Sequence, residues 1–150
     1  MSQTSFETLT ELAREARDKA SVLLAQEQQN QQQIVRQRDA LTEYRHDYAR
    51  ELQKHMLHGL EPGMLETYRH FLSSLDQAIE RANQALAAQQ ERVSASRQTW
   101  RSEQQRLTSY ETVQERQQQR QQRKARRQEQ KQADELASQL VQRQLAYQGH

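Results

Sequence analysis

Cysteine, glycine and proline are almost absent from this chain. Its 150 residues include no cysteine, three glycines and one proline, and only 33% of them are hydrophobic. The lack of cysteine excludes a disulfide framework and a cysteine-based metal site. A sandwich, barrel or doubly wound sheet needs frequent turn residues and a thick core. The composition therefore excludes these folds and leaves a disordered polar chain or long helices that bury one narrow stripe.

Long apolar runs are missing as well. No stretch approaches 18 consecutive apolar residues, so we expect no membrane span. The first residues, MSQTSFETLTEL, contain neither the basic region nor the apolar region of a secretory signal. The absence of cysteine fits a reducing compartment. We therefore expect no secretory signal and no membrane-spanning helix.

Helix-forming residues dominate what is present. Gln occurs 29 times, and Gln, Arg, Ala, Glu and Leu all favour helices. The only cluster of glycine and proline lies at residues 59–63. Glycine permits an escape from helical geometry, and Pro62 can begin a new helix. The sequence predicts helices over about 5–57 and 64–147, with a bend near 58–63.

Large apolar residues recur every seven positions in the second segment. This repeat is typical of a left-handed coiled coil, and a disordered chain would not keep it. The first column is Leu65, Leu72, Ile79, Leu86, Val93, Trp100 and Leu107, and its companion is Tyr68, Leu75, Ala82, Gln89, Ser96, Glu103 and Tyr110. In the first segment the expected seam is Phe6, Leu9, Ala13, Ala16, Ala20, Leu23, Glu27, Asn30, Ile34, Gln37, Leu41, Tyr44 and Tyr48.

Two seams separated by one breaker predict an all-α fold, with two long helices in an antiparallel coiled-coil hairpin. Residue i should then lie opposite residue 122 − i. The alternative is a parallel dimer of one long helix, which the glycine and proline cluster disfavours. We expect residues 1–150 to form a single domain with an unpaired overhang at about 118–150. Polar seam residues, including Glu27 and Gln89, should make the centre of the hairpin its softest part.

Signatures of catalysis are lacking. The sequence has no glycine-rich phosphate loop, no HExxH motif and no cysteine nucleophile. Glu51, His55 and His58 share one helical face and could hold a metal, but a solvated polar face is the favoured interpretation. A two-helix rod also offers no concave pocket to exclude water. We expect no enzymatic activity, no cofactor and no metal site.

Positive charge is concentrated in residues 115–131. This segment contains seven Lys or Arg residues against two acidic residues, a composition suited to an acidic protein surface or to phosphates. The segment lacks aromatic residues, which argues against nucleic acid. A solvated helix is the alternative interpretation. The candidate partner-binding residues are Arg116, Arg120, Arg123, Lys124, Arg126, Arg127 and Lys131, followed by the apolar Leu136 and Leu140.

Aromatic residues gather on both sides of the predicted bend. Tyr44 and Tyr48 lie four residues apart, and Tyr68 and Phe71 should lie opposite them. Tyr44, Tyr48 and Tyr68 fall at seam positions, so simple core filling is one interpretation. Phe71 should lie on the flank. The other interpretation is an aromatic binding surface on the side of the hairpin.

Several segments, in this order, resemble the FliJ family of flagellar export proteins. They are Leu9 to Leu24, LTEYRHDY at residues 41–48, YRHFL at 68–72, LDQAIE at 75–80, and Trp100 with Arg101. The resemblance implies a coiled coil similar to the γ subunit of rotary ATPases. It implies a component of the type III export apparatus that lies in the cytoplasm and is peripherally associated with the inner membrane.

The resemblance also implies partners. They are the hexameric export ATPase FliI, the export gate protein FlhA and export chaperones, with no nucleic acid. The ATPase would bind the basic segment together with Leu136 and Leu140. The alternatives are the equivalent stalk of a virulence injectisome, a coiled-coil chaperone and a basic nucleic-acid-binding rod. Carried over by position, the family's gate-binding surface falls on Gln37, Leu41, Tyr44, Tyr48, Phe71, Leu75 and Ala78.

Overall fold

Two long helices account for nearly all of the described chain. The computed structural model describes residues 3–149, in which α1 spans Gln3–Leu57 and α2 spans Pro62–Gln148. No strand occurs within residues 3–149. The all-α prediction is therefore confirmed.

The turn between the helices uses the glycine and proline cluster. Gly59 has a φ of 84°, in the left-handed region where glycine is favoured at the end of a helix. Pro62 is the first residue of α2, where its missing N–H costs no hydrogen bond. The carbonyl of Glu61 accepts hydrogen bonds from the backbone N–H groups of Met64 and Leu65, at 3.1 and 3.2 Å. The bend thus lies within the predicted range of 58–63.

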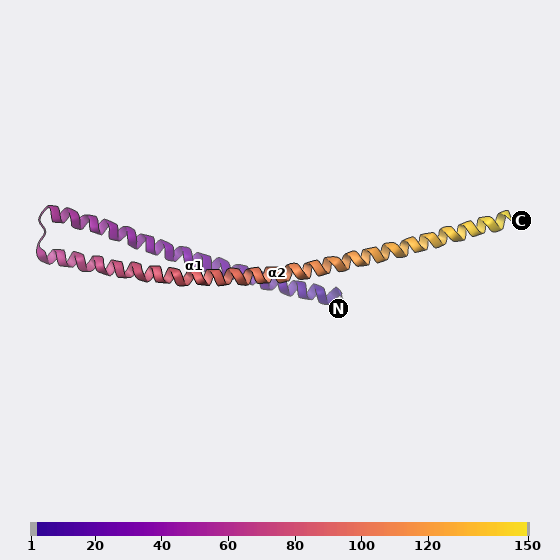
Figure 1. Ribbon diagram of the computed structural model, residues 1–150, viewed down its shortest axis with the longest axis horizontal. Coiled ribbons are helices and arrows are strands. Elements are labelled where there is room, and N and C mark those ends of the chain that lie inside the picture. Colours follow the sequence, from indigo (N-terminus) through magenta and orange to yellow (C-terminus); the bar gives the residue numbers. More distant parts are fainter. Residues whose placement is uncertain (1–2, 150) are drawn as a thin grey trace. The chain divides into compact units, whose positions relative to one another are not determined.

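The chain forms two compact units, one of residues 16–103 and the other of the described residues before and after them. In the 16–103 unit, α1 and α2 lie side by side and run in opposite directions (Figure 1). The indole Nε1 of Trp100 donates to the Ser21 hydroxyl at 2.7 Å. The guanidinium of Arg45 bonds to the carboxylate of Asp76. Both pairs lie within one residue of the predicted register, and the antiparallel hairpin is confirmed.

The register deviates at a polar position in the same unit. The predicted register places Gln89 opposite Gln33, but its side-chain amide donates to the carbonyl of Glu27 at 2.9 Å and also to the Glu27 carboxylate. Gln89 is buried. A buried amide needs hydrogen-bond partners, and its long side chain reaches those that the other helix offers. The amide of Gln89 therefore finds its partners at a residue six positions from the one that the predicted register places opposite it.

The predicted seam of α2 is correct along its whole length. No residue of either heptad column between Leu65 and Tyr110 is exposed. The apolar members that are most fully buried are Leu75, Leu86, Val93 and Leu107. The regular repeat of large apolar residues thus identifies the buried face of this helix.

The predicted seam of α1 is wrong over part of one of its two columns, from Leu23 to Tyr44, whereas Leu9 and Ala16 of that column are partly buried as predicted. Leu23, Asn30, Gln37 and Tyr44 are exposed, whereas the residue that follows each of them is partly buried. At two of these positions the partly buried residue is an Arg, Arg38 or Arg45, whose aliphatic stem can be buried while its charged group stays in water. The observed column is Thr10, Arg17, Leu24, Gln31, Arg38, Arg45 and Leu52.

The terminal unit is held by a short stretch of paired helix. The Thr10 hydroxyl donates to Gln114 Oε1 at 3.1 Å. In this unit Ala13 is buried, and Leu107 has the lowest exposure of the large side chains, 1%. Every residue of α2 from 118 onward is exposed, as is Gly149. Neither helix, over its described residues, contains a stretch that is apolar enough to cross a bilayer.

Candidate docking surfaces

Four aromatic rings meet across the two helices of the 16–103 unit. The ring of Tyr48 lies 4.8 Å from that of Tyr68 and 4.5 Å from that of Phe71, measured between centroids. The ring of Tyr44 lies 6.3 Å from Tyr48 and 6.0 Å, edge to face, from Phe71. These are favourable distances for aromatic pairs. The structure therefore brings together the aromatic residues that the sequence singles out.

The candidate gate-binding residues, which we call the aromatic face, differ in their exposure. Tyr44 is 52% exposed and Leu75 is 7% exposed. Tyr44 is thus a surface residue and not a core residue as its predicted seam position implies. Leu75 is buried in the seam, so it offers little surface to a partner. The aromatic face comprises Gln37, Leu41, Tyr44, Tyr48, Phe71, Leu75 and Ala78; Gln37 is exposed, and Leu41, Tyr48, Phe71 and Ala78 are partly buried.

A shallow apolar groove runs along one side of α1 within this face. Its lining residues are Gln37, Ala40, Leu41 and Tyr44. Gln37 and Tyr44 each lie three or four residues from Ala40 and Leu41, so the four residues share one side of the helix. Exposed apolar surface of this kind favours contact with another macromolecule.

An ion pair and a tyrosine hydroxyl add polar groups beside the rings. Asp76 accepts hydrogen bonds from Arg45 Nε and, at 3.4 Å, from Arg45 Nη2. This bond, and the charge of Asp76, raise the pKa of Arg45. Partial burial raises the pKa of Tyr48, and Tyr68, Tyr44 and Glu51 add to the effect. The Arg45 guanidinium therefore stays charged and the Tyr48 phenol stays neutral near pH 7.

The basic segment of α2 carries its charge on one side. At 100° per residue, six of its seven Lys and Arg side chains fall within an arc of about 100°, because each of them lies three or four residues from another. All seven are exposed, as are Leu136 and Leu140. The heptad columns of α2 continue here into polar residues such as Lys124 and Lys131, which explains why the seam ends. The six residues, which we call the basic face, are Arg116, Arg120, Arg123, Lys124, Arg127 and Lys131.

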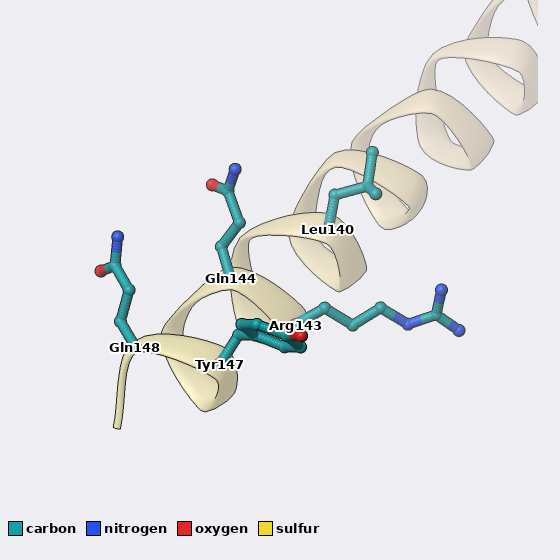
Figure 2. A pocket seen from close by; sticks show the side chains of 5 residues that line it. All are labelled: Leu140, Arg143, Gln144, Tyr147 and Gln148. Atoms are coloured by element: carbon teal, nitrogen blue, oxygen red, sulfur yellow. The ribbon is translucent and has the colours of Figure 1, made fainter. Parts of the chain in front are cut away.

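The last turns of α2 carry exposed apolar groups. Leu140 and Tyr147 line a shallow depression with Arg143, Gln144 and Gln148. Figure 2 shows Leu140, Gln144 and Gln148 projecting from the same side of α2, while Arg143 extends in another direction. The exposed fractions of Leu140 and Tyr147 are 61% and 89%. This end of the helix therefore offers apolar contacts next to a basic group.

The histidines near the turn form no metal site within residues 3–149. Glu51, His55 and His58 line a depression together with Lys54, but no described group of three or more His, Cys, Asp or Glu side chains is placed to hold an ion. The imidazole of His55 instead lies 5.9 Å from the ring of Tyr68.

Three residues beside the aromatic face are missing from the sequence prediction. Ala40 lines the groove, and Arg45 and Asp76 join the helices beside the rings. Ala40 gave no signal, because alanine is common on any helix surface. The Arg45–Asp76 pair was detectable, since the predicted register places Arg45 opposite Gln77, the neighbour of Asp76.

Known proteins resemble this chain in sequence and in fold. The profile of the flagellar FliJ protein family matches residues 1–146. A flagellar FliJ protein from Salmonella typhi is 31% identical over 113 residues, which cover 75% of this chain and 77% of the relative. One from Escherichia coli K12 is 31% identical over 110 residues, covering 73% and 75%. The structure of a putative YscO homologue from Chlamydia trachomatis superposes with a TM-score of 0.69 at 17% identity and covers 93% of this chain and 91% of that one.

Proposed function

The chain belongs to the FliJ family of flagellar export proteins, and we propose that it is a non-catalytic stalk that binds the hexameric export ATPase and links it to the membrane export gate and to export chaperones. It acts in the cytoplasm and reaches the inner membrane only through these partners. The observation that carries the proposal is that the chain presents two surfaces of different chemistry. One is formed by the exposed Lys and Arg side chains of the basic segment, and the other is the aromatic face, on which Gln37 and Tyr44 are exposed.

The basic segment is the proposed ATPase-binding surface. Its residues are exposed on a single helix, so they can approach acidic groups without first separating α1 from α2. The apolar Leu136 and Leu140 lie on the opposite side of α2 from the basic face. Around the helix axis they are about 150–170° away from the middle of that face. A flat partner cannot contact both sides, whereas the wall of a ring around the helix can. The central channel of a hexamer meets this requirement.

The aromatic face is the proposed gate-binding surface. Tyr44 is exposed while its ring is held against those of Tyr48 and Phe71. A large aromatic side chain that is already ordered loses little conformational freedom on binding. Such residues often contribute most of the energy of an interface. The proposed stalk thus uses different residues for its two principal partners.

A pair of variants tests this division. We expect the Gln substitutions of Arg120, Arg123, Arg126 and Arg127 to weaken ATPase capture and to leave gate capture unchanged. We expect Ala at Tyr44, Tyr48 and Phe71 to have the opposite effect. The measurement is a pulldown with each purified partner.

The matched control for the basic variant replaces four other exposed arginines of α2 by Gln. It should leave both partners bound, because these residues lie outside both surfaces. If the basic and aromatic variants weaken the two interactions to the same extent, the proposal is wrong. The control residues are Arg81, Arg92, Arg97 and Arg101.

A further inference from the structure

One side of α1 carries residues at heptad spacing that the contact with α2 buries only in part. Gln37, Leu41, Tyr44 and Tyr48 follow one another at steps of four, three and four. This is the spacing of residues that pack against another helix. Gln37 and Tyr44 are nevertheless exposed, because the adjacent column that includes Arg45 faces α2. We call these four residues the second heptad column.

The spacing of the second heptad column indicates that the bound segment of a partner is helical. A helix with apolar residues every 3.5 positions would keep its own apolar side against this column for several turns. The groove lined by Ala40, Leu41 and Tyr44 gives such side chains a place to pack. An extended peptide lacks this repeat and finds no strand edge here to pair with.

The charges beside the column specify the partner further. Glu43, Asp47 and Glu51 are exposed and spaced four residues apart, so they lie along one line of α1. By helical geometry this line borders Ala40 and Tyr44 on the side away from Arg45. The exposed Arg50 and Lys54 lie on the same side of α1 but farther from Tyr44, so the acidic residues are the charges nearest to Tyr44 on this side. In coiled coils, charged residues at such flanking positions determine which helix is accepted. We call these three residues the acidic column.

We propose that the second heptad column and the acidic column together bind an amphipathic α-helix of a partner protein, with apolar residues at heptad spacing and Lys or Arg on the flank that meets the acidic column. The bound helix packs on α1 as a third helix of the coiled coil. This proposal goes beyond the assignment of a gate partner, because it states that the part of the partner that binds is an amphipathic helix. It rests on the proposed function in one respect, that the aromatic face is a docking surface.

The test uses three synthetic peptides, each four heptads or about 28 residues long. The first has Leu and Ile at its seam positions and Lys at the flanks. The second has the same seam with Glu at the flanks, and the third has the Lys flanks with a scrambled seam. Like charges at the flanks oppose pairing of a peptide with itself. Binding to the full-length protein is measured by fluorescence anisotropy, and helix formation by circular dichroism.

We expect the Lys-flanked peptide to bind and to become helical, and the scrambled peptide not to bind. The Glu-flanked peptide should bind on the order of tenfold more weakly, because three attractive pairs become repulsive. Replacing Glu43, Asp47 and Glu51 by Lys should reverse this preference. Replacing Leu41 and Tyr44 by Ser should abolish binding of the Lys-flanked peptide.

A second acidic column on α1 provides the control. Glu7, Glu11 and Glu15 are exposed and have the same spacing, and their replacement by Lys should leave the preference unchanged. The inference is wrong if the three peptides bind equally, or if the two triple-Lys variants behave alike. Its failure is distinct from that of the proposed function, because the gate protein could still require Tyr44 while no helical peptide binds.

Discussion

Tyr44 and Leu75 both belong to the aromatic face, but their different exposure predicts opposite consequences of truncation. Leu75 is 7% exposed in the seam, and removal of a buried Leu side chain costs about 2–5 kcal/mol. A two-helix seam can partly close around a cavity, so we expect Leu75→Ala to cost about 2–3 kcal/mol of unfolding free energy. This lowers the urea midpoint by about 1 M.

Tyr44→Ala should have a small effect on stability and a large one on binding. The ring is half exposed and keeps two aromatic contacts, which limits the loss of unfolding free energy to about 1 kcal/mol. As a binding anchor it should contribute at least about 2 kcal/mol, or roughly thirtyfold in Kd for the gate protein. Leu75→Ala should change this Kd less than tenfold under conditions in which the variant is folded.

The assay for both variants is urea unfolding followed by circular dichroism at 222 nm, together with titration calorimetry against the gate protein. The wild-type protein and each variant are compared at the same concentration, below the onset of unfolding. If Tyr44→Ala destabilises the protein as much as Leu75→Ala, the assignment of Tyr44 to the surface is wrong. If it leaves the gate affinity unchanged, the aromatic face does not bind the gate through this residue.

Three further predictions concern the seam. Leu107→Ala should cost about 2–4 kcal/mol of unfolding free energy because the side chain is 1% exposed. Val113→Ala, at an exposed position, should cost less than about 1 kcal/mol. Equal shifts of the urea midpoint in the two variants would contradict the burial of Leu107. Replacing Glu27 and Gln89 together by Leu should stabilise the hairpin by about 1–2 kcal/mol, since apolar packing replaces a pair of hydrogen-bonded polar groups; a lower urea midpoint would refute this. Amide hydrogen exchange should be faster in the turns around Glu27 than in residues 65–86, and equal protection would show that the polar centre is not soft.

The buried face of α2 was predictable because its large apolar residues repeat strictly every seven positions. The face of α1 was only half predictable. Its sequence contains two adjacent columns, and an apolarity criterion prefers Tyr44 to Arg45 and does not distinguish Leu23 from Leu24. In the structure Leu24 and Arg45 are partly buried and Leu23 and Tyr44 are exposed. The stem of Arg45 can be buried while its guanidinium reaches Asp76. Hydrophobicity alone does not contain this information.

The candidate surfaces follow from the sequence to different degrees. The exposed basic segment was predictable, since charge and the loss of apolar heptad residues coincide there. The exposure of Tyr44 was not, because a tyrosine at heptad spacing is as compatible with a seam as with a surface. The hydrogen bonds from Gln89 to Glu27 were also hidden, since they join residues six positions away from the predicted pairing.

The central claim, a stalk that acts on the export ATPase through its basic segment, is tested most directly by ATPase stimulation. The cognate export ATPase is assayed alone, with the wild-type protein and with the variant that carries Gln at Arg120, Arg123, Arg126 and Arg127, and both the hydrolysis rate and hexamer formation are recorded. We predict that the wild-type protein raises the rate or promotes the hexamer and that the variant does so only at higher concentration. No effect of the wild-type protein on either quantity, or the same effect from the variant at every concentration, would contradict the claim.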